Sequence, residues 1–146
     1  MAALKSKKKK ERQKFDKYIT YHDIFALALA LTSIKVFSSD SMDWHRAFYE
    51  ICQKYGKSIP EISHIFFDHS RPPLPPMAEE VYDLQTLLMM SKELEGLGLA
   101  PHHILRIPDG VRPKIIKEEE KRLAKYMKQI RDMAIIFSKH LKTESG

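Results

Sequence analysis

Apolar residues change their spacing along the chain, and each spacing predicts an element. Residues 24–34 (IFALALALTSI) are almost all apolar, which is typical of a helix that is buried on every side. Thr20 followed three residues later by Asp23 resembles a capping box, so we expect this central helix to begin there and to run to about Ser33.

Two more helices are expected in the middle of the chain. Asp40 or Ser41 caps the first of these, which ends at Gly56. Apolar residues repeat along it at helical spacing, namely Trp44, Ala47, Phe48, Ile51, Cys52 and Tyr55. The next helix runs from about Met77 to Glu95, with Met77, Val81, Leu84 and Leu88 on its inner face. Between them, residues 57–76 are expected to be irregular, with an extended, polyproline-like segment at 72–76. We interpret this segment as a connector, and the alternative is a ligand for the aromatic groove of a small recognition domain.

A turn signal near the C-terminal third predicts a β-hairpin. Residues 102–107 and 111–116 are two short apolar runs on either side of Asp109-Gly110. A last helix, about Lys117 to Leu141, follows with Glu118 and Arg122 as an i,i+4 ion pair. The fold class is therefore mainly α, a winged-helix-like helical domain over residues 18–146 with one small hairpin and a long C-terminal helix.

Charge is distributed unevenly along the chain. The net charge of +6 equals that of residues 1–17, which hold eight basic and two acidic side chains. This segment has too few apolar residues to order itself, so we expect a disordered basic tail in which Lys7, Lys8, Lys9 and Lys10 either aid solubility or contact nucleic acid. Residues 18–111 carry seven basic and twelve acidic side chains, and residues 112–146 carry ten and five. The folded part is therefore bipolar.

The charges argue against a standard DNA-reading helix. The third helix, which a winged-helix protein would insert into the major groove, holds five acidic side chains and one lysine. The predicted hairpin and the residue after it are more favourable, because they hold the basic residues Arg106, Arg112, Lys114 and Lys117. These four are candidate contacts to an anionic partner, either a phosphate backbone or an acidic protein.

Residues typical of catalytic or metal sites do not occur at the required spacing. His45 and Cys52 lie two helical turns apart, but Cys52 belongs to an apolar stripe and is expected to be structural. His102 and His103 are adjacent on a predicted strand and point to opposite sides. The chain has no glycine-rich phosphate loop, G-x-S-x-G or H-E-x-x-H. We therefore expect no enzyme activity, no cofactor and no metal.

Two further features bear on localisation. A single cysteine excludes an internal disulfide and favours a reducing compartment. The apolar run at residues 24–34 is shorter than the roughly 20 residues that a membrane span needs. We expect a cytoplasmic protein that does not bind membranes.

The middle of the chain resembles the Panacea antitoxin-like domain family. The resemblance covers roughly residues 20–140 and includes residues 44–51 (WHRAFYEI), Phe66-Phe67, a proline-rich loop, a leucine-rich helix ending in Leu97-Gly98-Leu99, and a hairpin. It implies a helical domain from a prokaryotic, often phage-associated system that neutralises a protein toxin.

Three functions remain open from the sequence. The first is a non-catalytic intracellular protein-interaction module, antitoxin-like or phage-associated. The alternative is a DNA-binding winged-helix transcriptional regulator that contacts phosphates through its hairpin and tail. The third is an assembly component that oligomerises through its last helix.

Overall fold

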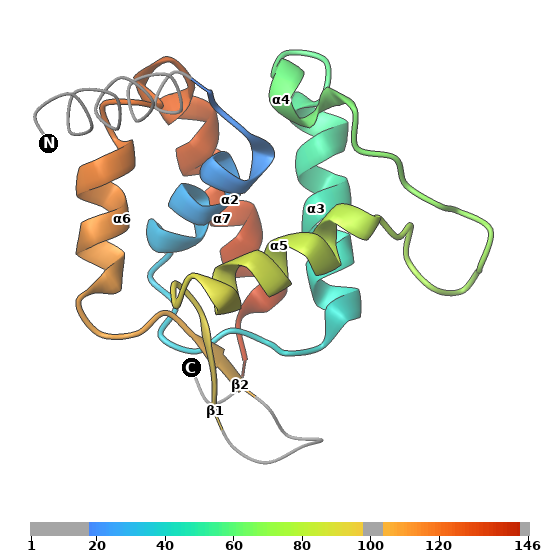
Figure 1. Cartoon of the computed structure of the whole chain (residues 1–146). Helices are drawn as coiled ribbons and strands as arrows, with labels where there is room; N and C mark the ends of the chain where they lie inside the picture. The colour runs from blue at the N-terminus through green and yellow to red at the C-terminus, as the bar shows by residue number, and fades with distance from the viewer. Residues whose placement is uncertain (1–17, 98–103, 144–146) are drawn as a thin grey trace, which may run out of the picture.

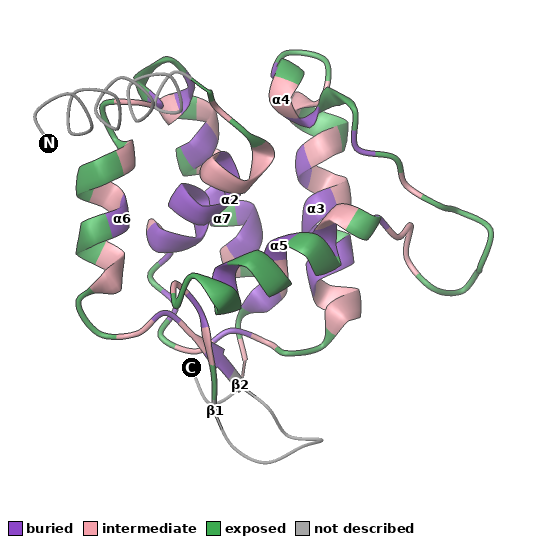
Figure 2. Cartoon of the chain, in the orientation of Figure 1, coloured by how far each residue is buried: buried purple, intermediate pink, exposed green. Residues whose placement is uncertain are grey.

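Helix α2 (Tyr21–Ala30) lies at the centre of the structure, a computed structural model that describes residues 18–97 and 104–143 (Figure 1). Every residue from Ile24 to Ala30 is buried, as predicted (Figure 2). The capping box is also confirmed, because the Thr20 side chain accepts from the Asp23 N–H and the Asp23 carboxylate accepts from the Thr20 N–H at 3.0 Å. The helix ends three residues earlier than expected.

Helices α3 (Ser41–Tyr55) and α7 (Met127–Leu141) pack against each other, and α7 also packs against α2. Phe25, Phe48 and Phe137 meet where these three helices join, with ring centroids 4.4 to 5.9 Å apart. Asp40 caps α3 through the Met42 N–H at 3.0 Å, as its sequence predicted. An aromatic cluster therefore forms the middle of the core.

Helix α5 (Glu79–Met90) crosses the front of the molecule in Figure 1, after the short helix α4 (Pro60–Ser63) and a long loop. It packs against α3 and buries only Val81, Leu84 and Leu88. The predicted helix extended to Glu95, but Lys92 has a positive φ of 62° that turns the chain out of the helix.

One small antiparallel hairpin follows α5, in which β1 (Glu95–Leu97) pairs with β2 (Ile104–Arg106). The predicted order of helices followed by a hairpin is present, and the mainly helical class is confirmed. Phe37, between α2 and α3, exchanges two backbone hydrogen bonds with Leu105, of 2.6 and 3.1 Å. This pairing ties the hairpin to the centre of the fold.

The predicted pairing across Asp109-Gly110 is wrong, because the second predicted strand is helix α6 (Val111–Glu119). Gly110 adopts φ 82° and serves as the N-cap of this helix instead of turning a hairpin. Pro113 is the third residue of α6, where a backbone N–H would have no acceptor within the helix.

A turn and the short 3₁₀ helix η1 (Ala124–Tyr126) separate α6 from α7, so the predicted single helix from Lys117 is two helices.

Arg112 attaches α6 to the end of α2. Its guanidinium donates to the carbonyl oxygens of Leu29, Ala30 and Thr32 and, at 2.7 Å, to that of Ile34. The last carbonyls of a helix have no partner within the helix, and a cation placed there also complements the helix dipole. Arg112 therefore supplies hydrogen-bond donors and a positive charge to the carbonyl oxygens at the apolar end of α2.

Ion pairs attach the start of α2 to the segment that follows α6. Arg122 pairs with Asp23 at 3.1 Å and with Glu119 at 2.6 Å, whereas the predicted partner was Glu118. Burial opposes ionisation of Asp23, but hydrogen bonds from His22, Thr20 and Arg122 outweigh burial and lower the pKa of Asp23 to about 2.

We expect Arg112→Met to lower the free energy of unfolding by about 2 kcal/mol, because it keeps the apolar stem but removes several hydrogen bonds from a charged donor. Urea unfolding followed by circular dichroism measures the change. The exposed neighbour provides the control, since Lys114→Gln should change stability by less than about 0.5 kcal/mol. Equal effects of the two substitutions would show that Arg112 does not stabilise the end of α2.

Candidate protein-interaction surface

The outward face of α5 exposes large apolar side chains. Tyr82, Leu87, Met89 and Met90 are all exposed, and Met90 has 76% of its surface accessible. Tyr82 and Met89 are seven residues apart and Leu87 and Met90 are three apart, so these side chains spread over the outer half of α5, opposite its buried stripe. We call this outer half the α5 surface (Figure 2). A cluster of this kind on one short helix is typical of a binding surface.

The same helix carries only negative charge. Glu79, Glu80 and Asp83 lie in α5, which contains no lysine or arginine. The two glutamates occupy the first turn, where they complement the helix dipole. The α5 surface is therefore apolar and acidic, which suits a protein with basic side chains better than a phosphate backbone.

A proline-rich loop of residues 70–76, the proline loop, extends beside α5 (Figure 1). Two backbone hydrogen bonds between Asp68 and Met77, of 2.7 and 3.1 Å, close its base. The Leu74 N–H donates to the Arg71 carbonyl at 2.9 Å, so this segment turns, and the predicted polyproline extension is wrong. Leu74 in this loop is exposed. A loop fixed in this way loses little conformational entropy when it binds.

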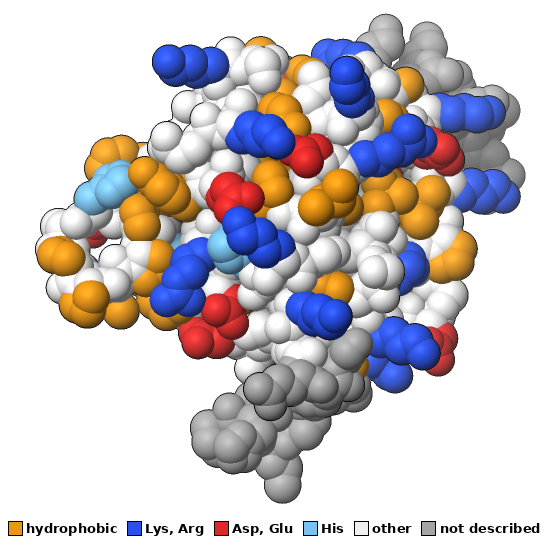
Figure 3. Space-filling view, turned by 180° about the vertical axis from the view of Figure 1, so that it is seen from behind, with side chains coloured by type: hydrophobic (Ala, Val, Ile, Leu, Met, Phe, Trp, Pro, Cys, Tyr) orange, Lys and Arg blue, Asp and Glu red, His pale blue; other side chains and the backbone are white. Residues whose placement is uncertain are grey.

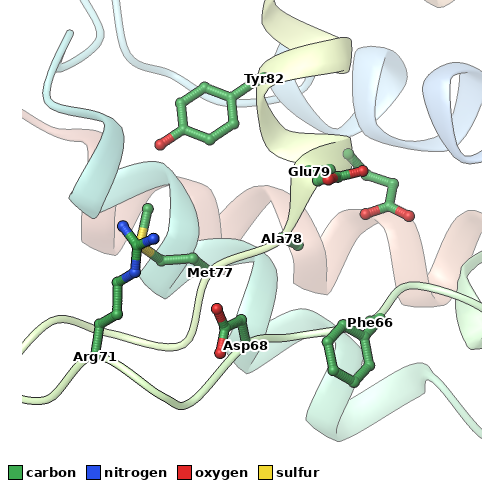
Figure 4. A pocket seen from close by; sticks show the side chains of 8 residues that line it. Phe66, Asp68, Arg71, Met77, Ala78, Glu79 and Tyr82 are labelled. Carbon is green, nitrogen blue, oxygen red and sulfur yellow. The ribbon is translucent and has the colours of Figure 1, made fainter.

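A hollow of about 450 Å³ joins the proline loop to the start of α5 (Figure 4). Phe66 and Tyr82 lie on either side of Met77 in this view, and Asp68 and Arg71 belong to the loop side. The hollow is lined by Phe66, Asp68, Arg71, Met77, Ala78, Glu79, Glu80 and Tyr82. It makes the proline loop and the α5 surface one continuous region.

His45 on α3 contacts the start of α5 and thereby positions this region. Its side chain is fully buried, and its Nδ1 accepts a hydrogen bond of 3.2 Å from the N–H of Ala78, the N-cap of α5. Its ring also packs edge-on against Tyr82, with centroids 5.0 Å apart. Burial lowers the pKa of His45, so the imidazole is neutral near pH 7 and its Nδ1 lone pair is available to accept.

Two of the four basic residues named as candidate contacts to an anionic partner have partners within the fold. Arg106 forms an ion pair with Glu95 across the hairpin, and the Arg112 guanidinium is occupied by the carbonyls described above. Lys114 and Lys117 are exposed on α6. The tail candidates Lys7, Lys8, Lys9 and Lys10 lie outside the described residues, as do His102 and His103.

The described residues contain no group of three or more histidine, cysteine or acidic side chains arranged to hold a metal ion. Cys52 is partly buried, and burial together with Glu80 raises its pKa to about 12, which disfavours the reactive thiolate. Over residues 18–97 and 104–143, no helix has both the length and the apolar composition to cross a membrane.

The sequence contained a signal for the α5 surface that the helical pattern did not use. Residues 87–90 (LLMM) are four consecutive apolar residues, and a helix that buries one stripe cannot bury all four. Leu88 is buried, while the other three are exposed. Phe66 and Leu74 lie in a loop, where helical spacing carries no information about exposure.

Comparisons with family models, curated proteins and solved structures found no match to this chain.

We expect the free energy of unfolding to fall as the pH drops below about 6.5, the ordinary pKa of histidine. Below this value the unfolded chain binds a proton at His45 while the folded chain does not, so stability decreases by up to about 1.4 kcal/mol per pH unit until the lowered folded pKa is reached. Urea unfolding from pH 7.5 to 5 measures the decrease.

The matched variant is His45→Asn, whose side-chain oxygen replaces Nδ1 as an acceptor but does not titrate. The difference between the two proteins isolates His45 from Glu93, because burial raises the pKa of Glu93 and gives it the opposite sign. The same pH dependence in both proteins would contradict the assignment to His45.

Proposed function

We propose that this protein is a non-catalytic protein-interaction module that binds its partner through the α5 surface and the proline loop. The observation that carries the proposal is the exposure of Tyr82, Leu87, Met89 and Met90 beside carboxylates that have no compensating basic residue in α5. The partner is a protein segment with apolar side chains flanked by lysine or arginine.

The composition and rigidity of the region support this proposal. Tyrosine and methionine are enriched in protein interfaces, and methionine adapts its shape to different partners. His45 and the Asp68–Met77 backbone pair hold the two parts of the region in place. Apolar side chains supply affinity, and the carboxylates select a basic partner.

A narrower form of the proposal is that the partner is a protein toxin. Its support is the sequence resemblance of residues 20–140 to the Panacea antitoxin-like domain. The single cysteine supports the reducing, cytoplasmic setting in which such a pair would meet.

The test is site-specific photocrosslinking in cells that produce the protein, with the crosslinker at position 90 or, as a control, at position 114 on α6. We expect a protein adduct from position 90 alone. With the identified partner purified, Leu87→Lys and Met90→Lys should each weaken binding by about tenfold or more in calorimetry, since they remove apolar contact and repel basic side chains.

The matched control is Gln53→Lys, which adds the same charge at an exposed position of α3. An identified partner whose affinity is unchanged by both α5 substitutions would overturn the proposal.

A second candidate function is DNA binding through basic side chains on α6, η1 and α7. Lys114, Lys117, Lys121, Lys125 and Lys128 are all exposed. Lysine and arginine side chains are spread over the back of the molecule in Figure 3, with fewer acidic ones among them. Such a surface contacts phosphates without reading sequence.

We expect the full chain to bind duplex DNA weakly and with little sequence preference, and fluorescence anisotropy at several salt concentrations measures this. Replacing Lys7, Lys8, Lys9 and Lys10 by Gln should remove most of the binding and lower the salt slope by up to about four. Replacing Lys114 and Lys117 by Gln should have a smaller effect. If the second variant loses more binding than the first, the folded body is the DNA-binding part and the regulator function takes precedence.

A further inference from the structure

A second hollow, of about 520 Å³, lies between the end of α2 and the outer side of α7. Ile135 borders it and has 66% of its surface exposed, although α7 otherwise packs its apolar side chains inward. Arg131 lies one turn before Ile135 and also lines the hollow. The complete lining is Leu31, Thr32, Ser33, Arg131, Ala134, Ile135 and Ser138. We call this region the α7 surface.

The charges next to the α7 surface are basic. Lys128 and Arg131 are exposed on α7. The acidic residue of this helix, Asp132, is engaged elsewhere, because it accepts hydrogen bonds of 2.5 Å from both Lys54 and Tyr55 on α3. The α7 surface therefore combines an exposed apolar side chain with basic side chains that form no ion pair within residues 18–97 and 104–143, and it suits an acidic, apolar helix.

The α5 surface is an acidic, apolar helix with the same residue spacing. Asp83 and Leu87 are four residues apart on α5, as Arg131 and Ile135 are on α7. Both pairs are exposed, and four residues correspond to about 6 Å along a helix. If the two helices lie side by side in parallel, Arg131 faces Asp83 when Ile135 faces Leu87.

We propose that the α7 surface binds the α5 surface of a second copy of this chain. This inference rests on the proposed function of the α5 surface and names one partner for it. Helix α5 lies in front of α7 in Figure 1, and the view from behind in Figure 3 shows apolar side chains among lysines and arginines. The contact joins two different surfaces, so it is heterologous and adds copies head to tail.

The experiment is sedimentation velocity of the pure full chain over a wide range of protein concentration, at low and high salt. We expect reversible self-association that weakens with salt, because exposed charges are screened. Asp83→Arg and Arg131→Asp should each weaken it by about tenfold or more, since each places like charges opposite one another. The double substitution should restore association, because it exchanges the two charges and opposite signs again face each other across the contact.

The control is Lys114→Asp, which makes the same charge change as Arg131→Asp on α6, outside both surfaces, and should leave association unchanged. Circular dichroism checks that each variant is folded. A chain that stays monomeric at every concentration overturns the proposal. The proposal is also overturned if the single substitutions do not weaken association. It is likewise overturned if the double substitution does not restore association.

Two outcomes separate this proposal from those above. If the chain is monomeric and Arg131→Asp reduces binding to duplex DNA, the α7 surface is a nucleic-acid interface. If the chain is monomeric but Met90→Lys loses a crosslinked partner, self-association fails while the proposed function of the α5 surface stands.

Discussion

The burial of α2 from Ile24 to Ala30 is the constraint on which the rest of the structure depends. A helix with no polar face must be covered on all sides, and it leaves its last carbonyls in a place that water cannot reach freely. Helices α6 and α7 pack against α2, and Arg112 of α6 binds its carbonyl end. One side of α6 and one side of α7 are therefore used to cover α2.

The position of α5 depends on this packing of the other helices. It packs on α3 through a narrow stripe, and the buried His45 accepts a hydrogen bond from the N–H of its N-cap, Ala78. With no further helix of the described part of the chain to cover its outer side, α5 keeps Leu87, Met89 and Met90 in solvent. The exposed apolar surface is thus a consequence of how the core is built, and three acidic side chains lie beside it on the same helix.

The sequence predicted the elements that local chemistry determines. The Thr20–Asp23 box, the Asp40 cap and the apolar run of α2 each depend on residues within a few positions of one another, and each is confirmed. The hairpin pairing was wrong because Asp109-Gly110 is compatible with either a turn or a helix start. In the structure Ile104–Arg106 pairs with Glu95–Leu97 instead, and Arg112 on α6 binds the end of a helix about 80 positions earlier in the chain, which are contacts that a local turn signal does not contain.

The same limit applies to the candidate site. The sequence alone showed that α5 is acidic, and this argued against a helix that binds in the major groove of DNA. The helical spacing predicted Val81, Leu84 and Leu88 on the inner face of α5, and these residues are buried. The spacing did not predict that Leu87, Met89 and Met90 remain exposed, because this depends on which other elements cover the outer side of the helix. Likewise, Arg106 and Arg112 look as available as Lys114 in the sequence, but their tertiary partners are an acidic strand residue and a helix end. Charge counts therefore describe the overall charge of a segment, whereas only tertiary packing determines which of its side chains remain exposed.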